Sequence, residues 1–442
     1  MLRKISLMLV FCLLFSSCLG LFGCAKPGVN GPTPSQDSST EEGDDLKANV
    51  KELTAGVTPS YVETSDPMTQ AEFYQVQRTF GVGMFQNVYA EKPGENALIS
   101  PLSIMTALLM AANGTGAGET RAQMVEVLCG ASLDSLTKYL ADYLGSLYSS
   151  EYVKLHTANS VWFRDTPTLE VKESFLSKMT GVFGADAYKA PFDQSTVDAI
   201  NAWCSENTDG MIPKVIDEID PETMLYLINA LLFDAQWSDT YHESNISDAK
   251  FTKADGTQQD VQLMYSVEKL YLQDDYAVGT LKSYAQGGYK FVAMLPNEGI
   301  TLEQYVASLT GEGIDTMIRE GEYANVKTKL PKFKNECSYK LNDILKAMGM
   351  PDAFNPAKAD FSEMGSCEGG NLYISSVIHK TAIEVNEVGT RAAAITVVEM
   401  AAESAIEMPP KTYELTFDRP FVYMIMDRNN VPLFIGVVNG IE

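Results

Sequence analysis

The stretch that decides the fold is NEVGTRAAAITVVEMAAESAIEMPP, from Asn386 to Pro410. By composition alone, its Ala, Glu and Met residues favour a short surface helix. If the segment runs as a strand, one face carries only small side chains: Thr390, Ala392, Ala394 and Thr396. The other face carries Arg391, Ala393, Ile395 and Val397. A strand with one uniformly small face can enter between existing strands without a clash, and Gly389 gives the backbone freedom to swing.

Six further motifs accompany this stretch: NALISPLSI from Asn96, TDGMI from Thr208, LINALLFDAQW from Leu227, LPKFKNECSYKLNDILKAMGM from Leu330, LYISSVIHKTAIEVNEVGT from Leu372 and LTFDRPFVYMI from Leu415. Together with the Gly-Thr start and the Ala-rich run, they resemble the serpin family from about Met68 to Glu442. The resemblance implies an α+β serpin fold with a large mixed central β-sheet, additional sheets, about nine helices and an exposed reactive loop.

The resemblance assigns a reactive-loop hinge to Gly389, Thr390, Arg391, Ala392, Ala393, Ala394 and Thr396. In this family a protease attacks the loop as a substrate and forms an acyl-enzyme, and the freed hinge then enters the sheet as a new strand. About fifteen inserted residues, at about 3.3 Å each, would carry the protease roughly 50 Å across the domain. We therefore expect suicide inhibition of serine or cysteine endopeptidases, from a native state held by kinetics.

The reactive bond follows from the usual spacing in the family. Counting fourteen residues from Gly389 gives Glu403, with Ser404 on the other side of the bond. A carboxylate before the bond suits a protease with a basic specificity pocket, such as a glutamyl endopeptidase. A shifted register would instead present Met400, Ala401 or Ala402 to elastase-like or subtilisin-like enzymes.

The resemblance also gives roles to buried residues. The positions that match Ser100, Ser103, Asn229 and His379 form a hydrogen-bonded cluster beneath the point where the central sheet opens. Buried polar groups of this kind must be paired, so breaking one should favour misopening. Trp237 matches the Trp of the breach, near the upper end of the opening, and it is equally compatible with an ordinary core aromatic.

The first residues resemble a lipoprotein signal peptide, residues 1–23. Arg3 and Lys4 precede an apolar run from Ile5 to Phe15, and Leu-Phe-Gly-Cys ends at Cys24. This pattern predicts lipidation of Cys24, with an uncleaved membrane anchor as the alternative. In both cases we expect an extracellular protein, which is either a cell-surface lipoprotein or secreted. It would contact the membrane only through the N-terminal anchor.

Residues 24–67 are rich in Gly, Pro, Ser, Thr, Asp and Glu, with almost no aromatic residue. Such a segment buries too little apolar surface to fold, so we predict a disordered tether and a serpin domain over residues 68–442. The 442 residues have a formal net charge of -25. Because a phosphate backbone needs a basic stripe that this chain lacks, we expect no nucleic-acid partner.

Apolar patterns locate the main elements. Five residues recur at helical spacing: Phe73, Val76, Phe80, Met84 and Val88. The next helix is apolar nearly all round and therefore buried, with Ser100 as its cap and Pro101 in its first turn. MLYLINALLF, from Met224, reads as a strand buried on both faces. LYISSVIHKTAIEVNE, from Leu372, also reads as β-structure, and a hairpin turn is predicted at residues 427–430.

The sequence offers little for catalysis. It has three histidines, His156, His242 and His379, and no G-x-S-x-G elbow. Cys129, Cys204, Cys337 and Cys367 allow disulfides, but no CxxC or His-paired spacing occurs, so we expect no metal and no cofactor. The helical pattern around Cys129 and Cys204 favours buried free thiols. We predict a monomeric inhibitor and no enzyme; the alternatives are a non-inhibitory binding, carrier or folding module, and a hydrolase using a Ser and His379.

Overall fold

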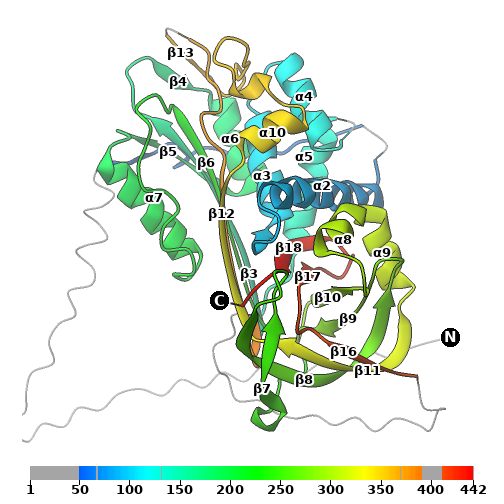
Figure 1. The fold of residues 1–442 in the computed structure, drawn as a ribbon. Helices are drawn as coiled ribbons and strands as arrows, with labels where there is room; N and C mark the ends of the chain where they lie inside the picture. Colours follow the sequence, from blue (N-terminus) through cyan, green and yellow to red (C-terminus); the bar gives the residue numbers. More distant parts are fainter. Residues whose placement is uncertain (1–48, 66–67, 131, 369, 391–410, 442) are drawn as a thin grey trace, which may run out of the picture. The chain divides into compact units, whose positions relative to one another are not determined.

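A seven-stranded sheet is the centre of the fold (Figure 1). The computed structural model describes residues 49–65, 68–130, 132–368, 370–390 and 411–441. In spatial order the strands are β1 (Lys51–Glu52), β5 (Ala185–Ala190), β3 (Val153–Arg164), β6 (Leu225–Gln236), β15 (Gly389–Thr390), β14 (Ile378–Val385) and β12 (Phe333–Lys340). The sheet is mixed, because β3 is parallel to β5 and antiparallel to β6. The prediction of a large mixed central sheet is confirmed.

A second, nine-stranded sheet carries the C-terminal part of the chain. Its order is β16 (Thr412–Thr416), β11 (Glu322–Pro331), β8 (Gln258–Gln273), β9 (Ala277–Ser283), β10 (Lys290–Pro296), β17 (Phe421–Met426), β18 (Pro432–Val438) and β2 (Ala97–Ile99), with β7 (Ile246–Thr252) on β8. The predicted turn between β17 and β18 is present: the backbone N–H of Asp427 donates to the carbonyl of Val431 at 3.0 Å. A third sheet pairs β13 (Gly365–Cys367) with β4 (Leu169–Val171).

Nine α-helices occur among the described residues, as the α+β prediction expected. They are α2 (Gln70–Glu91), α3 (Pro101–Ala112), α4 (Glu119–Val127), α5 (Leu133–Ser146), α6 (Glu173–Phe183), α7 (Gln194–Asn207), α8 (Leu302–Ser308), α9 (Gly311–Arg319) and α10 (Asn342–Met348). Figure 1 shows α4, α5, α6 and α10 gathered at one end of the central sheet, with β7, β8, β11 and β16 at the other. None of these helices is both long and apolar enough to cross a membrane.

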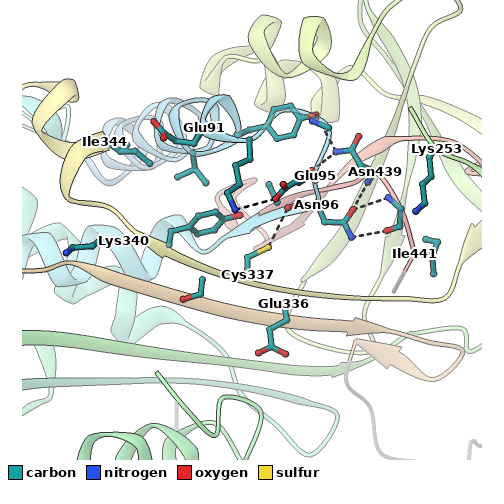
Figure 2. A pocket seen from close by; sticks show the side chains of 18 of the residues that line it. Glu91, Glu95, Asn96, Lys253, Glu336, Cys337, Lys340, Ile344, Asn439 and Ile441 are labelled. Carbon is teal, nitrogen blue, oxygen red and sulfur yellow. Dashed lines mark hydrogen bonds and ion pairs between the residues drawn. The ribbon is translucent and has the colours of Figure 1, made fainter. Parts of the chain in front are cut away.

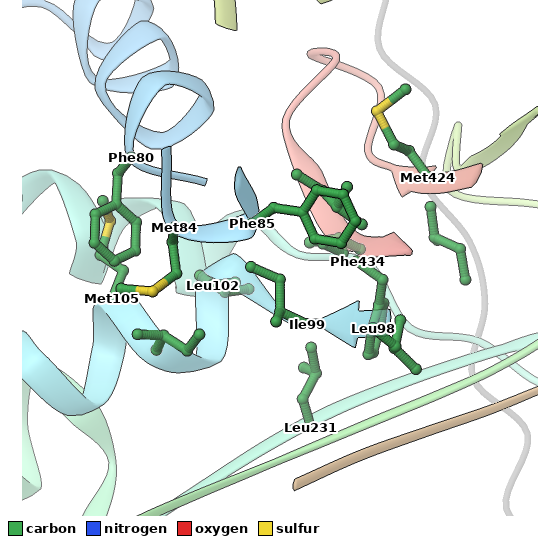
Figure 3. Packing of buried hydrophobic residues seen from close by; sticks show 14 of the residues in the cluster. Phe80, Met84, Phe85, Leu98, Ile99, Leu102, Met105, Leu231, Met424 and Phe434 are labelled. Atoms are coloured by element: carbon green, nitrogen blue, oxygen red, sulfur yellow. The ribbon is translucent and has the colours of Figure 1, made fainter. Parts of the chain in front are cut away.

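The main core forms around α3, between α2 and the two large sheets. Every residue of α3 is buried, Ser100 Oγ accepts the N–H of Ser103 at 3.2 Å as the cap, and Pro101 occupies the first turn. Figure 3 shows Leu102 and Met105 close to Phe80 and Met84 of α2. The expected helical face is also confirmed, with its residues buried except for Val76, which is half-buried.

The predicted tether differs from the structure over its last part. Residues 51–52 form β1 and extend the edge of the central sheet by pairing with β5. The N–H of Leu53 then donates to the carbonyl of Ala187 at 2.7 Å, and the N–H of Ser60 to that of Ser177 at 2.8 Å. Residues 51–60 therefore contact the domain that was predicted to begin at residue 68, through main-chain hydrogen bonds that composition does not reveal.

Two smaller expectations also change. Only the second half of LYISSVIHKTAIEVNE is strand, because β14 begins at Ile378 and residues 371–377 have no regular structure.

Cys204 is buried as predicted, but Cys129 is exposed. Its backbone φ is 58°, so it lies in the turn that ends α4 and not within the helix. The four described cysteines are free thiols.

Candidate functional site

The start of the predicted hinge lies inside the central sheet. Gly389 pairs with Gln236 of β6, and Thr390 pairs with both Ala235 of β6 and Val385 of β14. These two residues are the whole of β15. Along the rest of β6 and β14, the facing edges carry no other strand among the described residues. An extended segment that continued β15 would therefore find unpaired backbone groups on both sides.

Gly389 is required because β15 and β6 approach each other closely at this position. A Cβ atom at this position would lie 2.1 Å from the carbonyl oxygen of Ala235, where only a hydrogen atom fits. Thr390 is fully buried, and its Oγ1 lies 2.5 Å from the phenolic oxygen of Tyr284. The side chain of Thr390 therefore points into the core.

The residues before the hinge are held by the segment that leaves β6. Trp237 is buried, and its indole Nε1 donates to the carbonyl of Asn386 at 2.9 Å. Its backbone N–H donates to the carbonyl of Val388, also at 2.9 Å. Glu387 forms an ion pair with Lys332, Nζ to Oε2 at 2.9 Å, which lowers the pKa of the Glu387 carboxyl. The structure thus places Trp237 beside the first residues of the predicted hinge.

The four polar residues expected beneath the opening are brought together. The backbone N–H of Ser100 donates to Nε2 of His379 at 3.0 Å, and the N–H of Ser103 donates to Ser100 Oγ. Ser103 Oγ donates in turn to Oδ1 of Asn229. This chain of hydrogen bonds connects α3 to β14 on one side and to β6 on the other.

Asn159 of β3 completes this cluster and was not found by sequence reasoning. Asn229 Nδ2 donates to Asn159 Oδ1, and Asn159 Nδ2 donates to the carbonyl of Phe183 at 2.8 Å. Burial lowers the pKa of His379 to about 3, because desolvation disfavours the charged imidazolium. His379 therefore accepts the N–H of Ser100 as a neutral imidazole.

The remaining predicted site residues lie outside the described residues. They are the later hinge positions Arg391, Ala392, Ala393, Ala394 and Thr396, the reactive bond between Glu403 and Ser404, and Cys24. Among the residues that the structure describes, no cluster of His, Cys, Asp and Glu side chains could hold a metal ion.

Comparison with known proteins agrees with this geometry. A family model described as Serpin (serine protease inhibitor) matches residues 75–440. The chain belongs to the serpin family. Serpin B10 of Bos taurus is 32% identical to this serpin over 379 residues, which cover 78% of this chain and 93% of the relative. The leukocyte elastase inhibitor of Xenopus laevis is 33% identical over 375 residues, 81% of this chain and 96% of the relative.

An archaeal relative and two solved structures extend the comparison. An uncharacterised serpin-like protein of Thermococcus kodakarensis is 30% identical over 98% of both chains. The thermophilic serpin tengpin in its native state is 40% identical, with a TM-score of 0.82 over 89% of this chain and all of the other. Tengpin in its latent state is 39% identical, with a TM-score of 0.75 over 86% of this chain and all of the other.

A groove among the described residues lies elsewhere. It has a volume of about 690 Å³ and runs between the C-terminal end of α2, the free edge of β12 and residues 439–441 (Figure 2). Glu336 and Cys337 of β12 line one side of it, and Asn96 lines another. None of its lining residues belongs to the hinge or to the segment around Trp237. This groove is therefore separate from the candidate site, which is the opening between β6 and β14.

Proposed function

We propose that this serpin is a suicide-substrate inhibitor of serine endopeptidases, with cysteine endopeptidases as further targets. The observation that supports this most is the position of Gly389 and Thr390 between β6 and β14. The first two residues of a new strand are in register before any bond is cut. An inserting loop needs no further nucleation, because the next residues have pairing edges waiting for them.

In the proposed inhibition the protease carries out the chemistry and the serpin supplies the inserting strand. The protease nucleophile attacks the carbonyl carbon of Glu403, the bond to the nitrogen of Ser404 breaks, and an acyl-enzyme forms. The freed loop then extends β15 between β6 and β14, and the attached protease moves with it. Because Thr390 is buried, the residues on its face, Ala392, Ala394 and Thr396, enter the core, and their small size suits that course.

We further propose a glutamyl-specific endopeptidase as the partner, on the basis of Glu403. A relative is named leukocyte elastase inhibitor, which supports an endopeptidase as partner and makes elastase-like enzymes the second choice. Met400, Ala401 or Ala402 would serve such an enzyme, or a subtilisin-like one, in a shifted register. We place the protein outside the cytoplasm, as a monomer anchored through lipid on Cys24 or secreted.

The test is to incubate the chain from residue 25 with glutamyl, elastase-like, subtilisin-like and trypsin-like endopeptidases. Denaturing gels would show whether a complex resists denaturation, and mass spectrometry would locate the cut bond. We expect a denaturant-resistant complex with cleavage after Glu403. Cleavage without a complex, and without a rise in the melting temperature of the cleaved chain, would contradict inhibition and favour the non-inhibitory carrier or folding module.

A further inference from the structure

A buried lysine lies behind the hinge, in a place that sequence reasoning did not mark. Lys282 of β9 is 5% exposed, and its Nζ lies 3.1 Å from Oε1 of Glu268 on β8. The same carboxylate oxygen accepts the hydroxyl of Ser266 at 2.6 Å. Removing two charges from water is costly, and an apolar pair of similar volume is often as stable. Stability alone therefore does not account for an ion pair at this position.

The ammonium group faces two aromatic rings. Its Nζ lies 4.5 Å from the ring centroid of Tyr241 and 5.8 Å from that of Trp237. Both rings are buried, so this attraction between cation and ring is little weakened by solvent. Trp237 is also stacked on Tyr284, with centroids 4.5 Å apart and an interplanar angle of 16°. Lys282 thus joins the two ends of the segment that leaves β6, residues 237–241.

This segment holds the three residues that precede the hinge. Trp237 donates to the carbonyls of Asn386 and Val388, and the N–H of Tyr241 donates to the carbonyl of Glu387 at 2.9 Å. Consecutive carbonyls from residue 386 to residue 388 are therefore bound by Trp237 or Tyr241. Both of these residues are in contact with the ammonium group of Lys282.

We propose that Lys282, with Glu268 as its counter-ion, is a positioning residue for the reactive-loop hinge. It fixes the rings of Trp237 and Tyr241, and through their N–H groups it fixes residues 386–388 and hence the register in which β15 begins. This inference rests on the proposed inhibitory function. Without the cation, the hinge would be held less firmly, loop insertion would start more slowly, and a larger share of acyl-enzyme would be hydrolysed before it is trapped.

The test compares two variants that each remove a lysine charge. Lys282→Met combined with Glu268→Gln removes both partners, so that no buried charge is left unpaired. The matched control is Lys290→Met on the neighbouring strand β10, where Nζ binds Oδ1 of Asn430 and has no described contact with Trp237 or Tyr241. Lys282→Arg keeps the cation and should behave like the unchanged chain in every measurement.

Two measurements separate positioning from simple stability. Amide hydrogen exchange over residues 386–390 should become at least about threefold faster in the Lys282→Met/Glu268→Gln variant and stay unchanged in Lys290→Met, since a desolvated cation–ring contact is lost only in the first. With a trapped protease, the number of inhibitor molecules consumed per complex should rise by a similar factor. The association rate should not change, because it depends on the loop and not on its insertion.

The outcomes are distinguishable. If exchange over residues 386–390 is unchanged in the double variant while its melting temperature falls like that of Lys290→Met, Lys282 has only a structural role and the inference is wrong. If no protease is trapped by the unchanged chain, the proposed inhibitory function fails. Faster exchange at residues 386–390 would then still support the part of the inference that concerns the position of the hinge.

Discussion

Oγ1 of Thr390 lies 2.5 Å from the phenolic oxygen of Tyr284, with both residues buried. The first hinge side chain therefore has a fixed place in the core before any protease acts. A residue that cannot occupy this place should stop insertion at its first step.

Under the proposed function, replacement of Thr390 by Arg is expected to turn this serpin from an inhibitor into a substrate. A guanidinium group in this buried place would be an unpaired charge, which costs several kcal/mol, so the strand would not extend. Gels should show a cleaved chain and free, active protease, and the cleaved chain should not gain thermal stability. Thr390→Ser keeps the hydroxyl and should still form the complex; complex formation by the Arg variant would contradict the insertion mechanism.

The stability of this serpin should fall in acid because of His379. Its pKa is lowered to about 3 in the fold, from 6.5 for an ordinary His, so the unfolded chain binds a proton that the folded chain rejects. Between these two pH values the free energy of unfolding should decrease by up to about 1.4 kcal/mol per pH unit as pH falls. Above about pH 7 this contribution is complete and no longer varies.

The measurement is urea denaturation at pH 7.5 and at pH 5, for the unchanged chain and for His379→Gln. The Gln side chain can still accept the N–H of Ser100, but it does not titrate. A smaller difference between the two pH values in the variant is expected. Equal differences would show that other groups cause the loss of stability in acid.

The contact of the N-terminal segment with α6 can be tested through Gly181. A Cβ at this position of α6 would lie 2.0 Å from the carbonyl oxygen of Ser60, so Gly181→Ala must displace the segment and lower the melting temperature. In a chain that starts at residue 68 this obstacle is absent. There Ala should stabilise the helix relative to Gly by up to about 1 kcal/mol. The measurement is the melting temperature of four chains, with Gly or Ala at position 181 in the full chain and in the shortened one. A change in melting temperature of the same sign in both backgrounds would contradict the prediction.

The register of the reactive bond predicts which protease is trapped. Glu403→Arg should redirect the inhibitor from glutamyl to trypsin-like endopeptidases, because the side chain before the bond enters a pocket of opposite charge. The change in the second-order association rate for each enzyme measures this. Unchanged association rates for the glutamyl and trypsin-like enzymes would mean that the reactive bond is not the one after Glu403. Met400→Arg is the matched variant that tests the shifted register.

Much of the fold could be predicted because local pattern and burial agree. In α3 the apolar run, Ser100 and Pro101 all indicate the same helix, and in β6 a continuous apolar run indicates a central strand. The small side chains after Gly389 predict a strand that inserts, and this stays a prediction because they lie outside the described residues. Each of these signals can be read within about a dozen residues.

What the sequence did not reveal depends on distant partners. A Lys is ordinarily exposed, and only the contact with Glu268 and two rings makes Lys282 a buried residue. Asn159 looks like any polar residue of a strand until Asn229 lies opposite it. The segment at residues 51–60 is held largely by backbone hydrogen bonds, which leave no mark on amino-acid composition.

The facing edges of β6 and β14 accept any extended backbone, since main-chain groups do not distinguish one sequence from another. The serpin's own loop has the advantage of being covalently joined to Val385, which gives it an effective concentration on the order of millimolar. An extended segment from a neighbouring copy competes only when its local concentration approaches that value. We therefore expect covalent attachment to limit strand exchange between copies of this serpin, and crowding of molecules on one surface to weaken that limit.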